Sequence, residues 1–171
     1  LVRCFENGNI IHVEGNVNPL RDIETINLEL IFSDLEILER RISRTEKAMK
    51  GDKTLAQELA VLNKVKAALE NGISARAVPL TDDEKAMIAD VELLSMKPII
   101  YVANISEDQI GEQFKETETY RSLERLAKSE GAELLTICAE IESEIAELDG
   151  EDKEAFLDDL GIEESGLDML I

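Results

Sequence analysis

The runs PIIYVA at residues 98–103 and LLTICA at residues 134–139 are both continuously apolar and bounded by polar residues. Neither run alternates polar with apolar side chains, as a strand with one face in water does. We therefore predict two strands that are buried on both faces, which is typical of a parallel sheet. A helical pattern that stops at Gly131 separates them, so the three segments predict a βαβ unit.

A long helical stretch precedes this unit. Pro19 marks the start of a helix, and apolar residues recur in steps of three and four from about residue 22 to residue 50, which is a heptad pattern. Gly51-Asp52 breaks the pattern, and a second helix runs from about residue 54 to Asn71-Gly72. We predict an antiparallel helical hairpin with coiled-coil packing, about 40 Å long at the usual rise per residue.

The other predicted elements are short. LVRCF at residues 1–5 indicates the end of a strand, and TDDE at residues 81–84 is a capping box that opens a helix through about Leu94. Two further helices are expected near residues 141–148 and 153–160. The predicted fold class is α/β with a helical insertion, and its three parts are residues 1–21, 22–95 and 96–171.

Composition limits the functions that the chain can have. Of its 171 residues 44% are apolar and 33% charged, and the formal net charge is -20. Such a charge repels phosphate backbones, so any nucleic-acid contact has to be local. Two cysteines in apolar runs fit a reducing compartment, and no apolar run approaches ~18 residues. We expect a cytoplasmic protein without a membrane contact. Because the chain opens inside an apolar run and without Met, we also expect it to be a fragment.

The candidate chemistry lies where the predicted strands end, since ligands of open α/β sheets bind at the carboxyl ends of the strands. The first strand ends in Asn104-Ile105-Ser106-Glu107. P-loop GTPases hold the base with Asn-Lys-x-Asp at such a place, where the Asn ties neighbouring loops and the acid accepts hydrogen bonds from guanine. The second strand ends in Cys138-Ala139-Glu140, a loop that can offer backbone N–H groups to a base. Asn104 also suits a plain capping residue at a strand-to-helix turn.

Several longer runs resemble the Obg-like ATPases of the YchF group. The resemblance covers nearly the whole chain, and it implies a partial P-loop NTPase sheet, Rossmann-like, with a coiled-coil insertion. The runs are RCFE at 3–6, NIIHVEG at 9–15, NPLRDIE at 18–24, AELD at 146–149, GIEESGL at 161–167 and Lys97-Pro98 before the Asn-x-x-Glu strand.

The resemblance implies a nucleoside-triphosphate hydrolase that binds ATP at least as well as GTP, with Mg²⁺ in the full-length protein. Glu107 stands where guanine-specific enzymes have Asp, so guanine loses a well-placed acceptor. Ile105 would lie against the base and read its edge with its backbone N–H and C=O. A small C-terminal TGS domain follows in the family, which implies a link to the ribosome, translation or stress regulation.

His12, the one histidine of the chain, matches the family position proposed to orient the attacking water at the γ-phosphate. A neutral imidazole nitrogen can accept a hydrogen bond from water. The other reading is a loop histidine with no catalytic part.

The tip of the predicted hairpin is locally basic. Arg40, Arg44 and Lys47 fall on one helical face, and such a patch can contact RNA phosphates of a ribosome or another partner. No aromatic residue lies nearby to stack on bases, so the contact would not be sequence-specific. A solvated face that balances local acids explains the same residues.

The 171 residues contain neither a Gly-x-x-x-x-Gly-Lys-[Ser/Thr] loop nor an Asp-x-x-Gly segment directly at the end of a predicted strand. We therefore expect the chain alone to be inactive and to hold no nucleotide or metal tightly. Glu142 to Glu144 and Asp158-Asp159 indicate solvated helix faces rather than metal sites. Two rival interpretations remain, a helical docking rod and a nucleic-acid adaptor. A homodimer that covers the edge of the partial sheet is a further possibility.

Overall fold

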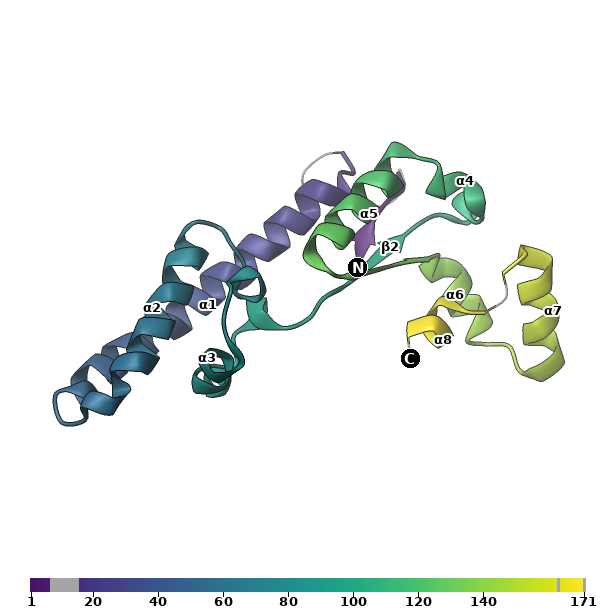
Figure 1. Cartoon of the computed structure of the whole chain (residues 1–171). Coiled ribbons are helices and arrows are strands. Elements are labelled where there is room, and N and C mark those ends of the chain that lie inside the picture. The colour runs from purple at the N-terminus through teal and green to yellow at the C-terminus, as the bar shows by residue number, and fades with distance from the viewer. Residues whose placement is uncertain (7–15, 163, 171) are drawn as a thin grey trace. The chain divides into compact units, whose positions relative to one another are not determined.

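The computed structural model describes residues 1–6, 16–162 and 164–170. These residues form two compact units, one made of residues 1–23 and 99–171 and the other of residues 24–98. The first unit holds a sheet with helices, and the second is helical (Figure 1). Among the described helices, none is both long and apolar enough to cross a membrane.

The sheet has three parallel strands in the order β1-β2-β3. Their bounds are Val2–Arg3 for β1, Ile100–Asn104 for β2 and Glu133–Ile137 for β3. The parallel α/β arrangement is confirmed. The prediction that the strands are buried on both faces is wrong within the described chain, because Tyr101 and Ala103 are 5% and 0% exposed whereas Ile100 is 49% exposed. Residues alternate between two faces, and only one face of β2 is fully covered.

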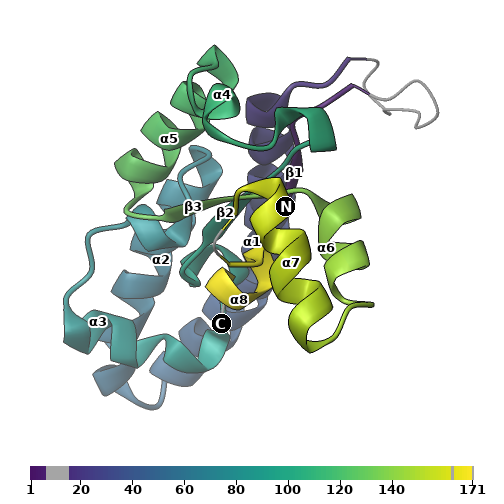
Figure 2. The same ribbon diagram turned by 90° about the vertical axis from the view of Figure 1, so that its right-hand side faces the viewer.

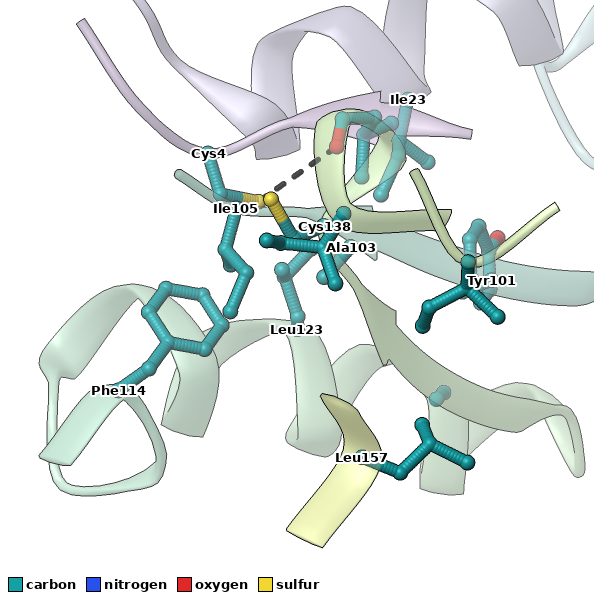
Figure 3. Close-up of a cluster of buried hydrophobic side chains, with 13 residues drawn as sticks. Cys4, Ile23, Tyr101, Ala103, Ile105, Phe114, Leu123, Cys138 and Leu157 are labelled. Atoms are coloured by element: carbon teal, nitrogen blue, oxygen red, sulfur yellow. Dashed lines mark hydrogen bonds between the residues drawn. The ribbon is translucent and has the colours of Figure 1, made fainter. Parts of the chain in front are cut away.

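Helix α5 (Glu118–Glu130) covers the buried face of the strands. Thr117 caps its first turn by accepting a hydrogen bond from the N–H of Tyr120 at 3.2 Å. Gly131 ends it in the left-handed conformation with φ of 64°, which glycine adopts without steric cost. Leu123 and Ala127 of α5 pack with Tyr101 and Ala103 in the core that Figure 3 shows.

The chain after β3 forms three helices, α6 (Ala139–Ile145), α7 (Gly150–Leu160) and α8 (Gly166–Leu170). The first two lie where the sequence predicts helices, and α8 was not predicted. Helix α8 packs against β3, as does α5 (Figure 2). A short helix, α4 (Glu112–Lys115), precedes α5.

The second unit is built on α1 (Pro19–Met49) and α2 (Ala56–Glu70). A turn and a short 3₁₀ helix, η1 (Lys53–Leu55), join them, so a long helical hairpin forms near the predicted bounds (Figure 1). Arg41 of α1 bridges Glu58 of α2 at 2.9 Å. The coiled-coil character of the hairpin stays a prediction. Its buried apolar residues from these two helices are Ile31, Leu38, Ile42, Val61, Leu62, Val65 and Leu69.

The third predicted helix is shorter than expected. The capping box forms, with Thr81 and Glu84 bonded reciprocally, but α3 spans only Asp82–Met87. Glu92 then adopts a left-handed conformation with φ of 55°. The 3₁₀ helices η3 (Ala89–Val91) and η4 (Leu94–Met96) follow α3 in place of a continued α-helix, and a third, η2 (Ala75–Ala77), precedes it.

A buried carboxylate of α1 holds the backbone of the segment that follows α3 and η3. Asp34 of α1 is 0% exposed, and its two oxygens accept the N–H groups of Leu94 and Ser95, each at 2.7 Å. The hydroxyl of Ser95 accepts the N–H of Ala75 at 3.0 Å. Buried carboxylates are tolerated when hydrogen bonds replace water. Asp34 therefore fixes residues 94 and 95 in the turn conformation that leads towards β2.

We predict that Asp34→Asn lowers the free energy of unfolding by about 1–3 kcal/mol, because the new amide presents a donor to one of two buried N–H donors. Urea denaturation of the 171-residue chain measures the loss. Glu29→Gln on the same helix is the matched control, since Glu29 is exposed, and it should leave stability unchanged. Equal stability of the two variants would contradict the role of Asp34.

Candidate nucleotide-base site

The ends of β2 and β3 lie side by side. Asn104 and Ile137 are partners in the parallel register, and the N–H of Ile105 donates to the carbonyl of Ile137 at 2.8 Å. The side-chain oxygen of Asn104 accepts the N–H of Ala139 at 3.0 Å, across 35 positions of sequence. Two of the predicted loops, one after each strand, are thus joined directly.

Asn104 also joins the first strand. Its backbone carbonyl accepts the N–H of Cys4 at 2.8 Å, one residue beyond the β1 pairing. The side chain of Asn104 is half-buried, and within the described chain its amide nitrogen has no hydrogen-bond acceptor. An amide NH₂ next to a strand end, held by its own oxygen, is a fixed donor for a ligand acceptor.

Ile105 differs from the expectation. Its side chain is 4% exposed and packs in the core with Phe114 and Leu123 (Figure 3). The ladder continues one residue beyond β2, so alternation places this side chain on the core face and uses its N–H. The prediction that the side chain and N–H of Ile105 contact a base is therefore corrected, and its carbonyl alone remains of the predicted groups.

The second loop contributes a backbone N–H group, that of Ala139, to the link with Asn104. Cys138 is 6% exposed and its side chain belongs to the core, while the N–H of Ala139 is taken by Asn104. Glu140 is exposed in the first turn of α6. Glu107 is likewise exposed, at the start of the 3₁₀ helix η5 (Glu107–Gln109) that Ser106 and Gln109 cap. Both carboxylates are thus accessible to a ligand.

The other predicted site residues are elsewhere. His12 lies outside the described residues. Arg40, Arg44 and Lys47 line one open groove on α1 together with Ser43, Glu36 and Glu39. Arg41, the neighbour of Arg40 in sequence, is not part of this groove and pairs with Glu58 at 2.9 Å and with Asp90 at 2.8 Å.

Glu142, near the base loops, differs from the sequence prediction. The sequence indicates that Glu142 lies on a solvated helix face, but it is 9% exposed, and its oxygens accept the N–H groups of Gly166 and Leu167. Ser165 and Asp168 have the spacing of a capping box at a helix start. This signal could have predicted the start of α8, whose N–H groups Glu142 binds. In the part of the chain that the structure describes, no group of three His, Cys, Asp or Glu is placed to hold a metal ion.

Comparisons with known proteins agree with this geometry. No protein-family model matches the chain. It is 48% identical to the "Ribosome-binding ATPase YchF" of Bacillus subtilis and 45% identical to that of Escherichia coli O157:H7, in each case over 100% of this chain. The "Schizosaccharomyces pombe YchF GTPase" structure superposes with a TM-score of 0.83 at 26% identity, over 99% of this chain.

The parallel strands, with polar loops side by side at their carboxyl ends, define an α/β protein of the class that binds ligands at this edge of the sheet. The chain belongs to the YchF family of Obg-like P-loop NTPases. It spans about half the length of the relatives that it matches, 47% and 46% of the two bacterial proteins and 46% of the yeast one.

Cys4, next to the site, gives a prediction on pH dependence. Burial, aided by the Asp22 carboxylate, raises the pKa of the Cys4 thiol from 9.0 to about 12. Above pH 9.0, the ordinary pKa of the thiol, the unfolded chain loses this proton and the folded chain keeps it. The free energy of unfolding should therefore fall with rising pH, by at most about 1.4 kcal/mol per pH unit.

Urea denaturation between about pH 8 and pH 11 measures this dependence. Cys4→Ala should show a shallower decline, because it lacks the thiol, whatever its stability at neutral pH. Identical slopes for the two proteins would contradict the shifted thiol.

Proposed function

We propose that the full-length protein binds and hydrolyses a nucleoside triphosphate, with ATP bound at least as well as GTP, and that this chain supplies the base-binding loops. The observation that carries the proposal is the hydrogen bond from the N–H of Ala139 to the side chain of Asn104. It connects the two strand ends and leaves one donor of known position. The names of the relatives, a ribosome-binding ATPase and a GTPase, support the same class of reaction.

The polar groups of the site suit a purine without selecting guanine strongly. The free amide of Asn104 can donate to a ring nitrogen that either purine offers as an acceptor. Glu107 is exposed and longer than the Asp that pairs with guanine's ring N–H and 2-amino group. Adenine lacks that amino group and has an acceptor at N1, so a displaced carboxylate costs guanine its advantage and adenine nothing.

Hydrolysis requires groups that the described residues do not provide. Phosphoryl transfer needs a phosphate-binding loop and Mg²⁺, and no cluster among the described residues fits a metal. We propose that these parts belong to the rest of the full-length protein, that His12 orients the attacking water, and that the 171-residue chain alone does not turn over ATP. We also propose that the protein is cytoplasmic and linked to translation, in line with the names of its ribosome-binding relatives.

The test uses the full-length protein and separates two roles of the Asn104 side chain, the link to Ala139 through its oxygen and the donation to a base through its NH₂ group. Asn104→Asp keeps an oxygen for Ala139 but loses the NH₂ donor, whereas Asn104→Ala loses both. We expect each to weaken ATP binding about tenfold or more by isothermal titration. Only Asn104→Ala should also speed hydrogen exchange at the Ala139 amide.

Asn63→Asp is the matched control, because Asn63 is exposed on α2, and it should bind ATP like the unchanged protein. Unaltered affinity in Asn104→Asp would contradict the base-binding role. ATP turnover by the 171-residue chain, measured beside the full-length protein, would contradict the proposal that the phosphate-binding parts lie in the rest of the full-length protein.

A second function, contact with ribosomal RNA, is favoured by the groove on α1. Arg44 and Lys47 are exposed and have no ionic partner within the described chain, whereas the acid Glu39 of the same groove pairs with Lys66 at 3.3 Å. Free cations on an acidic chain give local, salt-dependent binding to phosphates. A protein partner of the hairpin is the alternative, and a homodimer of the isolated chain remains a separate proposal.

Charge reversal tests this surface. Changing Arg40, Arg44 and Lys47 together to Glu should lower ribosome affinity about tenfold or more and flatten its dependence on salt, with ATP binding unchanged. Co-sedimentation of the full-length protein with ribosomes measures both effects. The control triple on α5, Arg121, Arg125 and Lys128 to Glu, carries the same charge change and should bind normally. Equal loss in both triples would show that net charge alone matters.

A further inference from the structure

Glu142 stands one turn after the loop that contacts Asn104. It is 9% exposed, and its two oxygens accept the N–H of Gly166 at 2.7 Å and the N–H of Leu167 at 3.3 Å. No basic side chain bridges it within the described chain. A carboxylate withdrawn from water in this way depends on those donors, so α6 and the first turn of α8 are held to each other.

Gly166 allows this contact because it has no side chain. A Cβ added there would clash with Cγ2 of Ile137 and lie 2.9 Å from Oε1 of Glu142. The backbone of Gly166 does not have a positive φ, so a larger residue is excluded by the close approach and not by conformation. Helix α8 therefore rests directly on the last residue of β3.

That residue belongs to the candidate base site. Ile137 is the register partner of Asn104, so the two side chains leave the sheet on the same face. Its carbonyl also accepts the N–H of Ile105. The start of α8 thus touches both elements that position the Asn104–Ala139 bond, β3 through Ile137 and α6 through Glu142.

Further contacts hold α8 in place. Asp168 accepts hydrogen bonds from Lys153 of α7 at 3.0 Å and from the hydroxyl of Ser165 at 2.8 Å. These two bonds hold the pKa of the Asp168 carboxyl below its ordinary value. Glu142, Lys153, Ser165 and Asp168 line one small hollow among α6, α7 and α8, so the three helices share one polar cluster behind the base loop.

We propose that Glu142 and Gly166 are positioning residues for the nucleotide base, acting through α8 as a support behind the loop of residues 138–140. This rests on the proposed function, since the affected ligand is the purine ring of a nucleoside triphosphate. When α8 is seated, the N–H of Ala139 stays against Asn104 and fixes the free amide. When α8 is displaced, the amide loses its orientation and the base is held less well, whereas the phosphates are not affected.

The experiment uses the full-length protein with Glu142→Gln and Gly166→Ala. Glutamine replaces one acceptor by a donor that faces an N–H, and alanine forces α8 away from Ile137. Each should weaken ATP binding about threefold to tenfold, which corresponds to the loss of about one hydrogen bond. Affinity for inorganic tripolyphosphate, which has no base, should not change. The double variant should lose little more than either single one, because the two act on one contact.

Matched controls are Glu144→Gln, an exposed residue of the same helix, and Gly51→Ala, where an added Cβ meets only an ordinary contact at 3.7 Å. Both should bind ATP normally. Equal losses for ATP and tripolyphosphate would show general damage and overturn the proposal, as would unchanged ATP affinity in both Glu142→Gln and Gly166→Ala. Should those two fail to fold, Lys153→Met, which removes only the bond to Asp168, supplies the same comparison.

Hydrogen exchange at the Ala139 amide distinguishes failure of this inference from failure of the base-binding function. Faster exchange in Glu142→Gln and Gly166→Ala, measured on the 171-residue chain without nucleotide, supports the positioning role even when ATP does not bind. Unchanged exchange overturns it even when ATP binds as proposed.

Discussion

The parallel pairing of β2 with β3 is the constraint on which the α/β unit depends. Its ladder extends one residue past β2, through the N–H of Ile105 and the carbonyl of Ile137, and this brings two loops from distant parts of the sequence to one edge. The backbone of Asn104 forms hydrogen bonds within the sheet, and its side chain accepts the N–H of Ala139 in the neighbouring loop. Fold and candidate site therefore share the same few hydrogen bonds.

Much of the architecture could be predicted from local signals. Pro19, the capping residue Thr81 and Gly131 all act on the backbone within a few residues, so these helix starts and stops can be predicted from the sequence. The pairing of the two strand ends was also predictable, because parallel strands joined by one helix place their carboxyl ends together. That rule places the loops after the two strands side by side, and the structure adds the hydrogen bond between the Ala139 N–H and the Asn104 side chain.

The remaining features depend on contacts between distant residues. The backbone at residues 94 and 95 is held by Asp34, which lies 60 positions from Leu94, and no local pattern shows this. Glu142 resembles a surface residue in sequence, and only the seating of α8 withdraws it from water. The burial of Ile105 goes with the extra ladder bond from its N–H to Ile137 of β3, and the residues around Ile105 in sequence do not show that bond.

The buried carboxylate of Asp34 also sets where the helical unit can be divided. A hairpin excised after α2 for transfer to another scaffold would lack residues 94 and 95, whose N–H groups are the partners of this anion. Asp34 would then be a bare charge on an apolar helix face and would favour hydration and opening of that face. A transferable module must therefore extend through η4, or carry an apolar residue at position 34.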